Sequence, residues 1–180
     1  MGAIVRKLGG FAGRFRKARG GATAVEFAMV ALPFFFMMFA ILELGRVFVL
    51  TSTLENAAMD AGRQIRTGHL QTTGGTAATF KEAVCERMGI FAGDCESRLT
   101  VDVRVLPQFD DPDAPDPMAG GTFDEGDLTF QPGTAEDIVL VRTWWRQALF
   151  TPFMAEGLSR LNDGNVVVTS ATAFRNEPYQ

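Results

Sequence analysis

The sequence predicts an α+β fold: a long N-terminal transmembrane helix that continues as a stalk and packs on a small antiparallel sheet. Three observations support this prediction. Residues 27–42 are apolar and uncharged, a helical repeat of apolar residues continues to residue 65, and three later segments have strand-like composition. A chain of 180 residues has room for a membrane segment and one module of ordinary domain size.

Residues 1–21 form a basic leader in an otherwise acidic chain. The leader holds six of the 17 basic residues and no acid, whereas the whole chain has a formal net charge of −4. Because the leader directly precedes a membrane-length apolar run, we interpret its charge as a topology signal and expect no nucleic-acid partner. The leader is therefore expected in the cytoplasm, and the C-terminal part of the chain outside it.

Residues 22–50 are predicted to cross the membrane as one helix. The uncharged run is followed by further apolar residues up to Leu50. At about 1.5 Å per residue this helix extends about 43 Å, more than the roughly 30 Å of a hydrocarbon core. A cleaved secretory signal is the alternative, but its apolar region would be only about 7–15 residues long.

Glu26 and Glu43 flank the uncharged run, which as a helix would be about 24 Å long. Both acids can therefore lie at the two membrane interfaces without any special role. A carboxylate drawn into the hydrocarbon core instead costs a few kcal/mol or more unless it is paired. Physical reasoning alone leaves both placements of Glu26 open.

Residues 51–70 are predicted to continue the membrane helix outward as a stalk. Apolar residues recur at spacings of three and four, which is typical of one buried helix face. These residues are Leu50, Leu54, Ala58, Ala61 and Ile65. Arg63 and Arg66 are expected to face water.

Residues 71–180 are predicted to form an α+β module that begins with a second helix over 76–89, capped by Thr76. This helix carries Cys85, and Cys95 follows shortly after it. The two cysteines are the only ones in the chain, and the compartment outside the cytoplasm is oxidising. We predict a disulfide worth on the order of 3 kcal/mol at most, with two unpaired buried thiols as the alternative.

Three segments of the module are predicted strands of one antiparallel sheet: residues 97–106, 135–145 and 165–174. The first alternates, with apolar side chains on one face (Leu99, Val101, Val103 and Val105). A turn at residues 162–164 precedes the third strand. Aromatic residues near the second strand form either core or a partner-binding surface, of which core is favoured. They are Trp144, Trp145, Phe150 and Phe153.

Residues 107–133 are rich in aspartate, proline and glycine, which predicts either a long exposed loop or a partly disordered segment. Clustered aspartates suit a calcium ion, because hard cations prefer oxygen ligands. The spacing of the EF-hand loop is absent, however, and a solvated loop is favoured over a metal site. The aspartates concerned are Asp110, Asp111, Asp113 and Asp116.

The leader ending in Gly20-Gly21, the segment Ala22-Thr23-Ala24-Val25-Glu26-Phe27 and the apolar helix together resemble the processing site of type IV-like prepilins. In detail the site is similar to that of Flp pilins and TadE-like pseudopilins of the bacterial tight-adherence (Tad) system. The resemblance implies that a membrane prepilin peptidase cuts between Gly21 and Ala22, and that Glu26 becomes the fifth residue of the mature chain. Residues 57–68 and 173–179 also resemble segments of TadE-like proteins, although the sequence alone gives the latter no role.

Cleavage there would create an ammonium group at Ala22, with an unperturbed pKa of about 8, next to Glu26. In a packed helical array Glu26 would accept the ammonium of its own or a neighbouring subunit, which favours one register. The resemblance thus assigns assembly to Glu26 and Phe27. It implies contact with the lipid bilayer, the prepilin peptidase, the major Flp pilin, other minor pseudopilins and the inner-membrane assembly platform.

The function expected from these features is that of a TadE-like minor pseudopilin in the assembly of a Tad/Flp-type adhesion pilus. The resemblance implies a pilin-like helix-on-sheet plan in a single-pass protein of the bacterial inner membrane with a periplasmic module. Whether the protein enters the pilus after assembly stays open. No cofactor and no enzyme activity are expected, because the sequence has one histidine and no nucleophile elbow or phosphate-binding loop. The alternative is an uncleaved, membrane-anchored periplasmic binding or sensor module.

Overall fold

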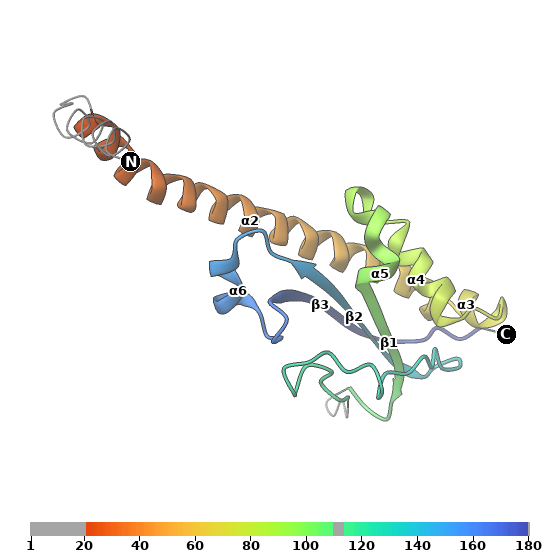
Figure 1. Cartoon of the computed structure of the whole chain (residues 1–180). Helices are drawn as coiled ribbons and strands as arrows, with labels where there is room; N and C mark the ends of the chain where they lie inside the picture. The colour runs from red at the N-terminus through yellow and green to blue at the C-terminus, as the bar shows by residue number, and fades with distance from the viewer. Residues whose placement is uncertain (1–20, 110–113, 180) are drawn as a thin grey trace, which may run out of the picture. The chain divides into compact units, whose positions relative to one another are not determined.

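The computed structural model describes residues 21–109 and 114–179 (Figure 1). It confirms the predicted α+β class, with a long apolar helix followed by a three-stranded antiparallel sheet. The leader lies outside the described residues except for Gly21. The elements are α2 (Gly21–Arg66), α3 (His69–Thr72), α4 (Ala77–Cys85), the 3-10 helix η1 (Gly89–Asp94), α5 (Cys95–Arg98), β1 (Leu99–Leu106), β2 (Ile138–Ala148), α6 (Pro152–Leu158) and β3 (Asn165–Arg175).

The chain divides into two compact units, one up to Ile41 and one from Leu42 onward. The described part of the first unit, residues 21–41, is helical throughout, and Pro33 does not interrupt the helix assignment. Its side chains are largely exposed, and Glu26 is its one charged residue. The most apolar window of α2 has a mean hydropathy of 2.2. By length and composition, α2 is therefore able to cross a membrane.

The second unit is built around the stalk part of α2, whose predicted apolar face is confirmed. Leu50, Leu54, Ala58, Ala61 and Ile65 are all buried. Most of them pack in one core with α4 and one face of the sheet, and fully burying a leucine contributes about 1.5–3 kcal/mol. Other members of this core are Phe80, Val84, Met88, Val103, Val139, Val141, Trp145 and Val168.

The sheet has the order β1-β2-β3, and both pairs are antiparallel. Val103 lies opposite Val141, which lies opposite Thr172. The outer edge of β1 is covered, because Val103 N–H donates to Thr129 O at 2.9 Å and its carbonyl accepts Gln131 N–H at 2.7 Å. β3 is the other edge strand.

The ends of two helices differ from the predicted bounds. α2 ends at Arg66 instead of residue 70, because Gly68 has a φ of 76° and turns the chain. α4 starts after Thr76 as predicted, and Thr76 and Thr79 form a reciprocal capping box. It ends at Cys85 instead of residue 89, where η1 begins.

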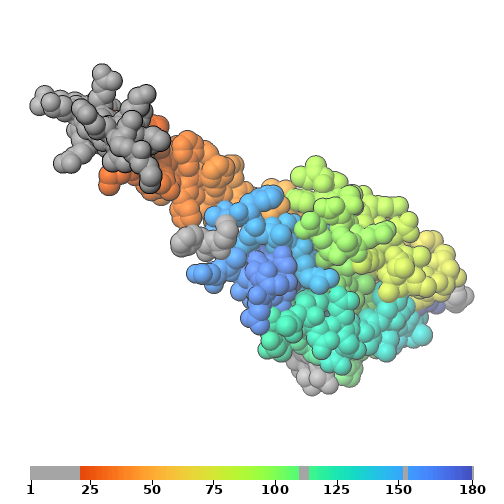
Figure 2. All heavy atoms as spheres, in the orientation of Figure 1, coloured from red at the N-terminus to blue at the C-terminus, as the bar shows by residue number. Residues whose placement is uncertain are grey.

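The loop between β1 and β2 packs on the second face of the sheet, which the sequence did not predict. Figure 2 shows residues 114–133, in teal, against the rest of the module. Met118 is buried beside Trp144 and Leu161, and Phe123 and Leu128 pack on the same cluster. Asp110, Asp111 and Asp113 lie outside the described residues. Three apolar side chains thus attach a loop whose composition is otherwise that of an exposed segment.

Candidate functional site

Gly21 and Ala22, the predicted cleavage site, are the first described residues of α2, and both are helical. Both residues are exposed, and nothing lies within 4 Å of where a Cβ of Gly21 would be.

Glu26 and Phe27, the predicted assembly residues, lie one turn further along α2. Both are exposed, with Phe27 at 71%. Within residues 21–109 and 114–179, Glu26 forms no hydrogen bond or ion pair. Because Ala22 and Glu26 are four residues apart, they lie on the same helix face.

Cys85 and Cys95 form the predicted disulfide, with a Cα–Cα separation of 5.5 Å. Cys85 ends α4 and Cys95 starts α5, so the bond closes the segment that contains η1. Both cysteines are buried in the main core. The disulfide therefore fixes the connection between α4 and β1.

Glu43 forms a contact that was not predicted from the sequence. Its side chain is buried, and its two carboxylate oxygens accept the backbone N–H groups of Phe150 and Thr151 at 2.5 and 2.8 Å. Arg46, one turn along α2, donates to Ala148 O at 2.8 Å, and its guanidinium lies 4.3 Å from the Phe150 ring centroid. We refer to these interactions as the loop contact, since they attach residues 148–151 to α2.

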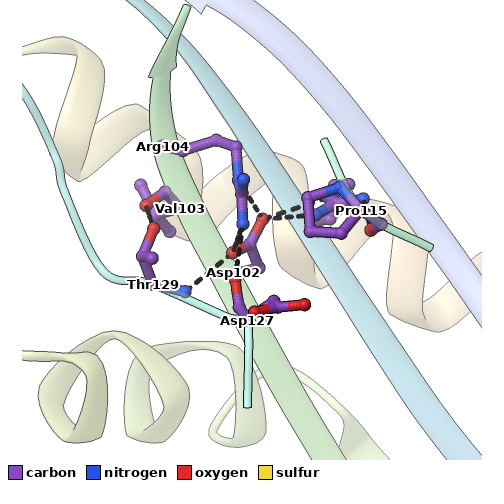
Figure 3. Close-up of polar contacts among 7 residues, drawn as sticks. Asp102, Val103, Arg104, Pro115, Asp127 and Thr129 are labelled. Atoms are coloured by element: carbon purple, nitrogen blue, oxygen red, sulfur yellow. Dashed lines mark hydrogen bonds and ion pairs between the residues drawn. The ribbon is translucent and has the colours of Figure 1, made fainter. Parts of the chain in front are cut away.

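Asp102 is the centre of a buried charged cluster (Figure 3). It is fully buried, and both its oxygens accept hydrogen bonds from two arginines, Arg104 and Arg142, at 2.8–3.0 Å. Thr129 N–H donates to the same carboxylate at 2.9 Å. The arginines also donate to loop carbonyls, Arg142 to Pro115 at 2.8 Å and Arg104 to Asp127 at 3.0 Å. The cluster therefore joins the sheet to the loop that covers its second face.

The pKa of Asp102 reflects two opposing effects. Burial alone would raise it, because removal from water disfavours the charged form. The hydrogen bonds from Arg104, Thr129 and Arg142, together with the charge of Arg142, outweigh burial and lower the pKa below its usual value. The carboxylate is therefore ionised in the folded protein near neutral pH.

Residues 176–179 hold the end of α2, which gives a structural role to a segment that the sequence left without one. Glu177 N–H donates to Arg66 O at 2.8 Å. Asn176 is buried, and its side-chain amide donates to the carbonyls of Pro132 and Thr134 at 3.0 and 2.9 Å. The ring of Tyr179 lies on Gly68, where a Cβ would be 2.3 Å from ring atoms.

Both tryptophans are core residues, as favoured from the sequence: Trp145 is in the main core and Trp144 lies under the loop. Phe150 differs, because its ring is 79% exposed. Within residues 21–109 and 114–179, no group of three or more His, Cys, Asp or Glu side chains is arranged to hold a metal ion.

Comparison with known proteins gives one match. Residues 21–63 match the sequence model of a family described as TadE-like protein. This segment covers nearly all of α2, including Gly21, Glu26 and Glu43, and it confirms the resemblance expected from the sequence. No curated protein and no solved structure matches the chain.

Proposed function

We propose that this chain is a minor pseudopilin of a Tad pilus system that a prepilin peptidase cuts between Gly21 and Ala22. The match of residues 21–63 to the family of TadE-like proteins supports this proposal. The observation that carries the proposal is the exposed helix of residues 21–41. It presents a continuous apolar surface with one carboxylate, Glu26, near its start. Such a surface suits packing against lipid and against other pilin helices.

The chemistry of cleavage explains why the carboxylate lies at this position. Cutting before Ala22 makes its nitrogen an ammonium one helical turn from Glu26, on the same helix face. Each charge is costly in an apolar medium, and each lowers the cost of the other when they are close. An uncut chain has no ammonium at this point, so Glu26 would remain without that partner.

The module supports an orientation with the leader in the cytoplasm and residues 51–180 in the periplasm. The buried disulfide between Cys85 and Cys95 suits an oxidising compartment, and the basic leader suits the cytoplasmic side. In this orientation the mature helix joins the major Flp pilin, other minor pseudopilins and the assembly platform through its membrane part.

The proposal is tested by expressing the full chain with its prepilin peptidase and measuring the intact mass of the membrane protein. The expected mature chain begins at Ala22, and the full-length chain accumulates in cells with an inactive peptidase. Glu26→Gln is expected to be cut normally and retained in the membrane, yet to be lost from the sheared pilus fraction. The reason is that glutamine has the same shape without the charge that the ammonium needs.

The matched control is Glu55→Gln, the same change at an exposed position of α2 inside the module. It is expected to leave both cleavage and pilus assembly unchanged. A mature protein that keeps residues 1–21 would favour the uncleaved, membrane-anchored binding or sensor module. Unchanged recovery of the Glu26→Gln protein in the sheared pilus fraction would contradict the charge-pairing role.

A further inference from the structure

The loop contact fixes an aromatic ring in an exposed position. Glu43 holds two consecutive backbone N–H groups, and Arg46 holds the preceding carbonyl of Ala148. The blue segment after β2 accordingly reaches α2 in Figure 1. The backbone of residues 148–151 is thus held against α2 at three points.

An exposed phenylalanine that is held in place calls for a function. Leaving such a side chain in water forgoes about 1.5–3 kcal/mol of burial. Phe150 is nevertheless 79% exposed, with one face over the Arg46 guanidinium. Arg46 also lines a pocket with Ile90, which is 88% exposed. Arg46 thus lies beside the Phe150 ring and lines the same pocket as Ile90.

Residues 43–46, which take part in the loop contact, directly follow the apolar part of α2. Residues 27–42 are uncharged, and the first charged residue after them, Glu43, is the one that binds the loop. Side chains that pair an apolar body with a charged tip are typical of the membrane–water interface, where arginine reaches the headgroups and aromatic rings lie among them. The arrangement of Arg46 and Phe150 matches that environment.

We propose that Phe150 enters the headgroup region of the phospholipid bilayer beside the point where α2 leaves it. The inference rests on the membrane anchoring of α2, but it requires neither cleavage nor pilus assembly. It places the outer boundary of the membrane at residues 43–46, earlier than Leu50. The loop contact then acts as a stop that sets how deep the helix lies.

The test places a fluorescent side chain at Phe150 in the full chain, reconstituted at low density in phosphatidylcholine vesicles. Phe150→Trp is expected to emit at shorter wavelength than in water and to be quenched strongly by lipids that carry a nitroxide near the headgroup. The emission of the buried Trp144 and Trp145 is removed by subtracting the spectrum of the unsubstituted protein. The matched control is Phe109→Trp, an exposed phenylalanine beyond the opposite end of β1.

Phe109→Trp is expected to show the emission of a water-exposed indole and little quenching. Equal quenching at both positions would show nonspecific adsorption and overturn the proposal. A Phe150→Trp spectrum without lipid quenching would also overturn it, and a short emission wavelength in that case would indicate burial against another protein copy. None of these outcomes depends on whether the leader is removed, so this proposal can fail while the proposed function stands.

Discussion

Asp102 shows how much one residue can determine inside the module. Its carboxylate is fully buried between Arg104 and Arg142, whose side chains are only 14% and 10% exposed. A buried ion pair adds little net stability compared with apolar residues, but removing one partner leaves the other charge uncompensated. Both arginines donate hydrogen bonds to this carboxylate, so its loss should be costly.

Asp102→Asn is therefore expected to lower the free energy of unfolding by about 3–5 kcal/mol, measured by urea unfolding of the full chain in detergent micelles. The matched control is Asp127→Asn. Its side chain is exposed, and only its backbone carbonyl contacts the cluster. The control should change the unfolding free energy by less than about 0.5 kcal/mol. A similar loss of unfolding free energy in the two variants would show that the buried cluster does not stabilise the module more than an exposed aspartate does.

The same carboxylate predicts a pH dependence. Because the folded protein lowers the pKa of Asp102, the stabilisation is complete above the unfolded-state value of about 4 and is lost as pH falls through the lower folded value. The asparagine variant has no such group. The difference in unfolding free energy between the unsubstituted protein and Asp102→Asn should therefore shrink below about pH 4. If this difference in unfolding free energy stays constant down to pH 2, the predicted pH dependence is wrong.

Glu43 is the second residue whose ionised carboxylate accepts specific hydrogen bonds inside the module. A carboxylate accepts hydrogen bonds at both oxygens, whereas glutamine presents one acceptor and one donor. Glu43→Gln therefore sets an amide donor against one of the N–H groups of Phe150 and Thr151. We expect a loss of about 1–3 kcal/mol in unfolding free energy, since a buried donor is left without an acceptor.

The control for Glu43→Gln is again Glu55→Gln on the exposed side of the same helix. Protection of the Phe150 and Thr151 amide protons from exchange with solvent provides a second, local measurement. It should fall in Glu43→Gln and stay unchanged in the control. Unchanged protection in Glu43→Gln would mean that the loop is held by other contacts, such as that of Arg46 with Ala148 O.

At the scale of elements, the end of α2 depends on a segment from the other end of the sequence. Gly68 adopts the left-handed conformation that commonly terminates a helix, and its N–H donates to Ile65 O at 3.0 Å. Glycine is needed here twice, because its φ is positive and because Tyr179 occupies the space of a Cβ.

Gly68→Ala is accordingly expected to cost more than the roughly 1–2 kcal/mol of left-handed strain, as measured by urea unfolding. The control is Gly74→Ala, at a similar φ of 69° but with nothing within 4 Å of the added Cβ. The excess cost of Gly68→Ala over Gly74→Ala then measures the displacement of Tyr179. Adding Tyr179→Ala to Gly68→Ala should remove that excess. Equal costs for the two glycine variants would show that the ring moves aside freely.

Elements with a regular repeat were predictable, and elements held by distant contacts were not. Leu50, Leu54 and Ile65 repeat with the period of a helix, so the buried face of α2 followed from the sequence. The packing of the loop at 114–133 was not predicted. It depends on a few apolar residues, such as Met118, in a segment whose composition indicates solvent exposure. Composition averages over a segment, whereas packing is decided by single side chains.

At the scale of the whole molecule, the sequence indicated the membrane end of the chain and missed how the module attaches to it. Glu26 stood out because a lone carboxylate near the start of an apolar helix is costly. Glu43 did not, because its partners are backbone N–H groups of Phe150 and Thr151, more than a hundred residues away. Every residue has a backbone N–H, so no pattern in the sequence marks such partners.

The contact of residues 176–179 with the end of α2 has a consequence for the order of synthesis. α2 is translated first, but the groups that bind Arg66 O and cover Gly68 are translated after every strand of the sheet. A chain interrupted before Asn176 would hold all its strands and still lack these contacts. The stalk thus reaches its final state only in a polypeptide that has been read through to that point, which gives cellular proteases a physical basis for removing incomplete copies.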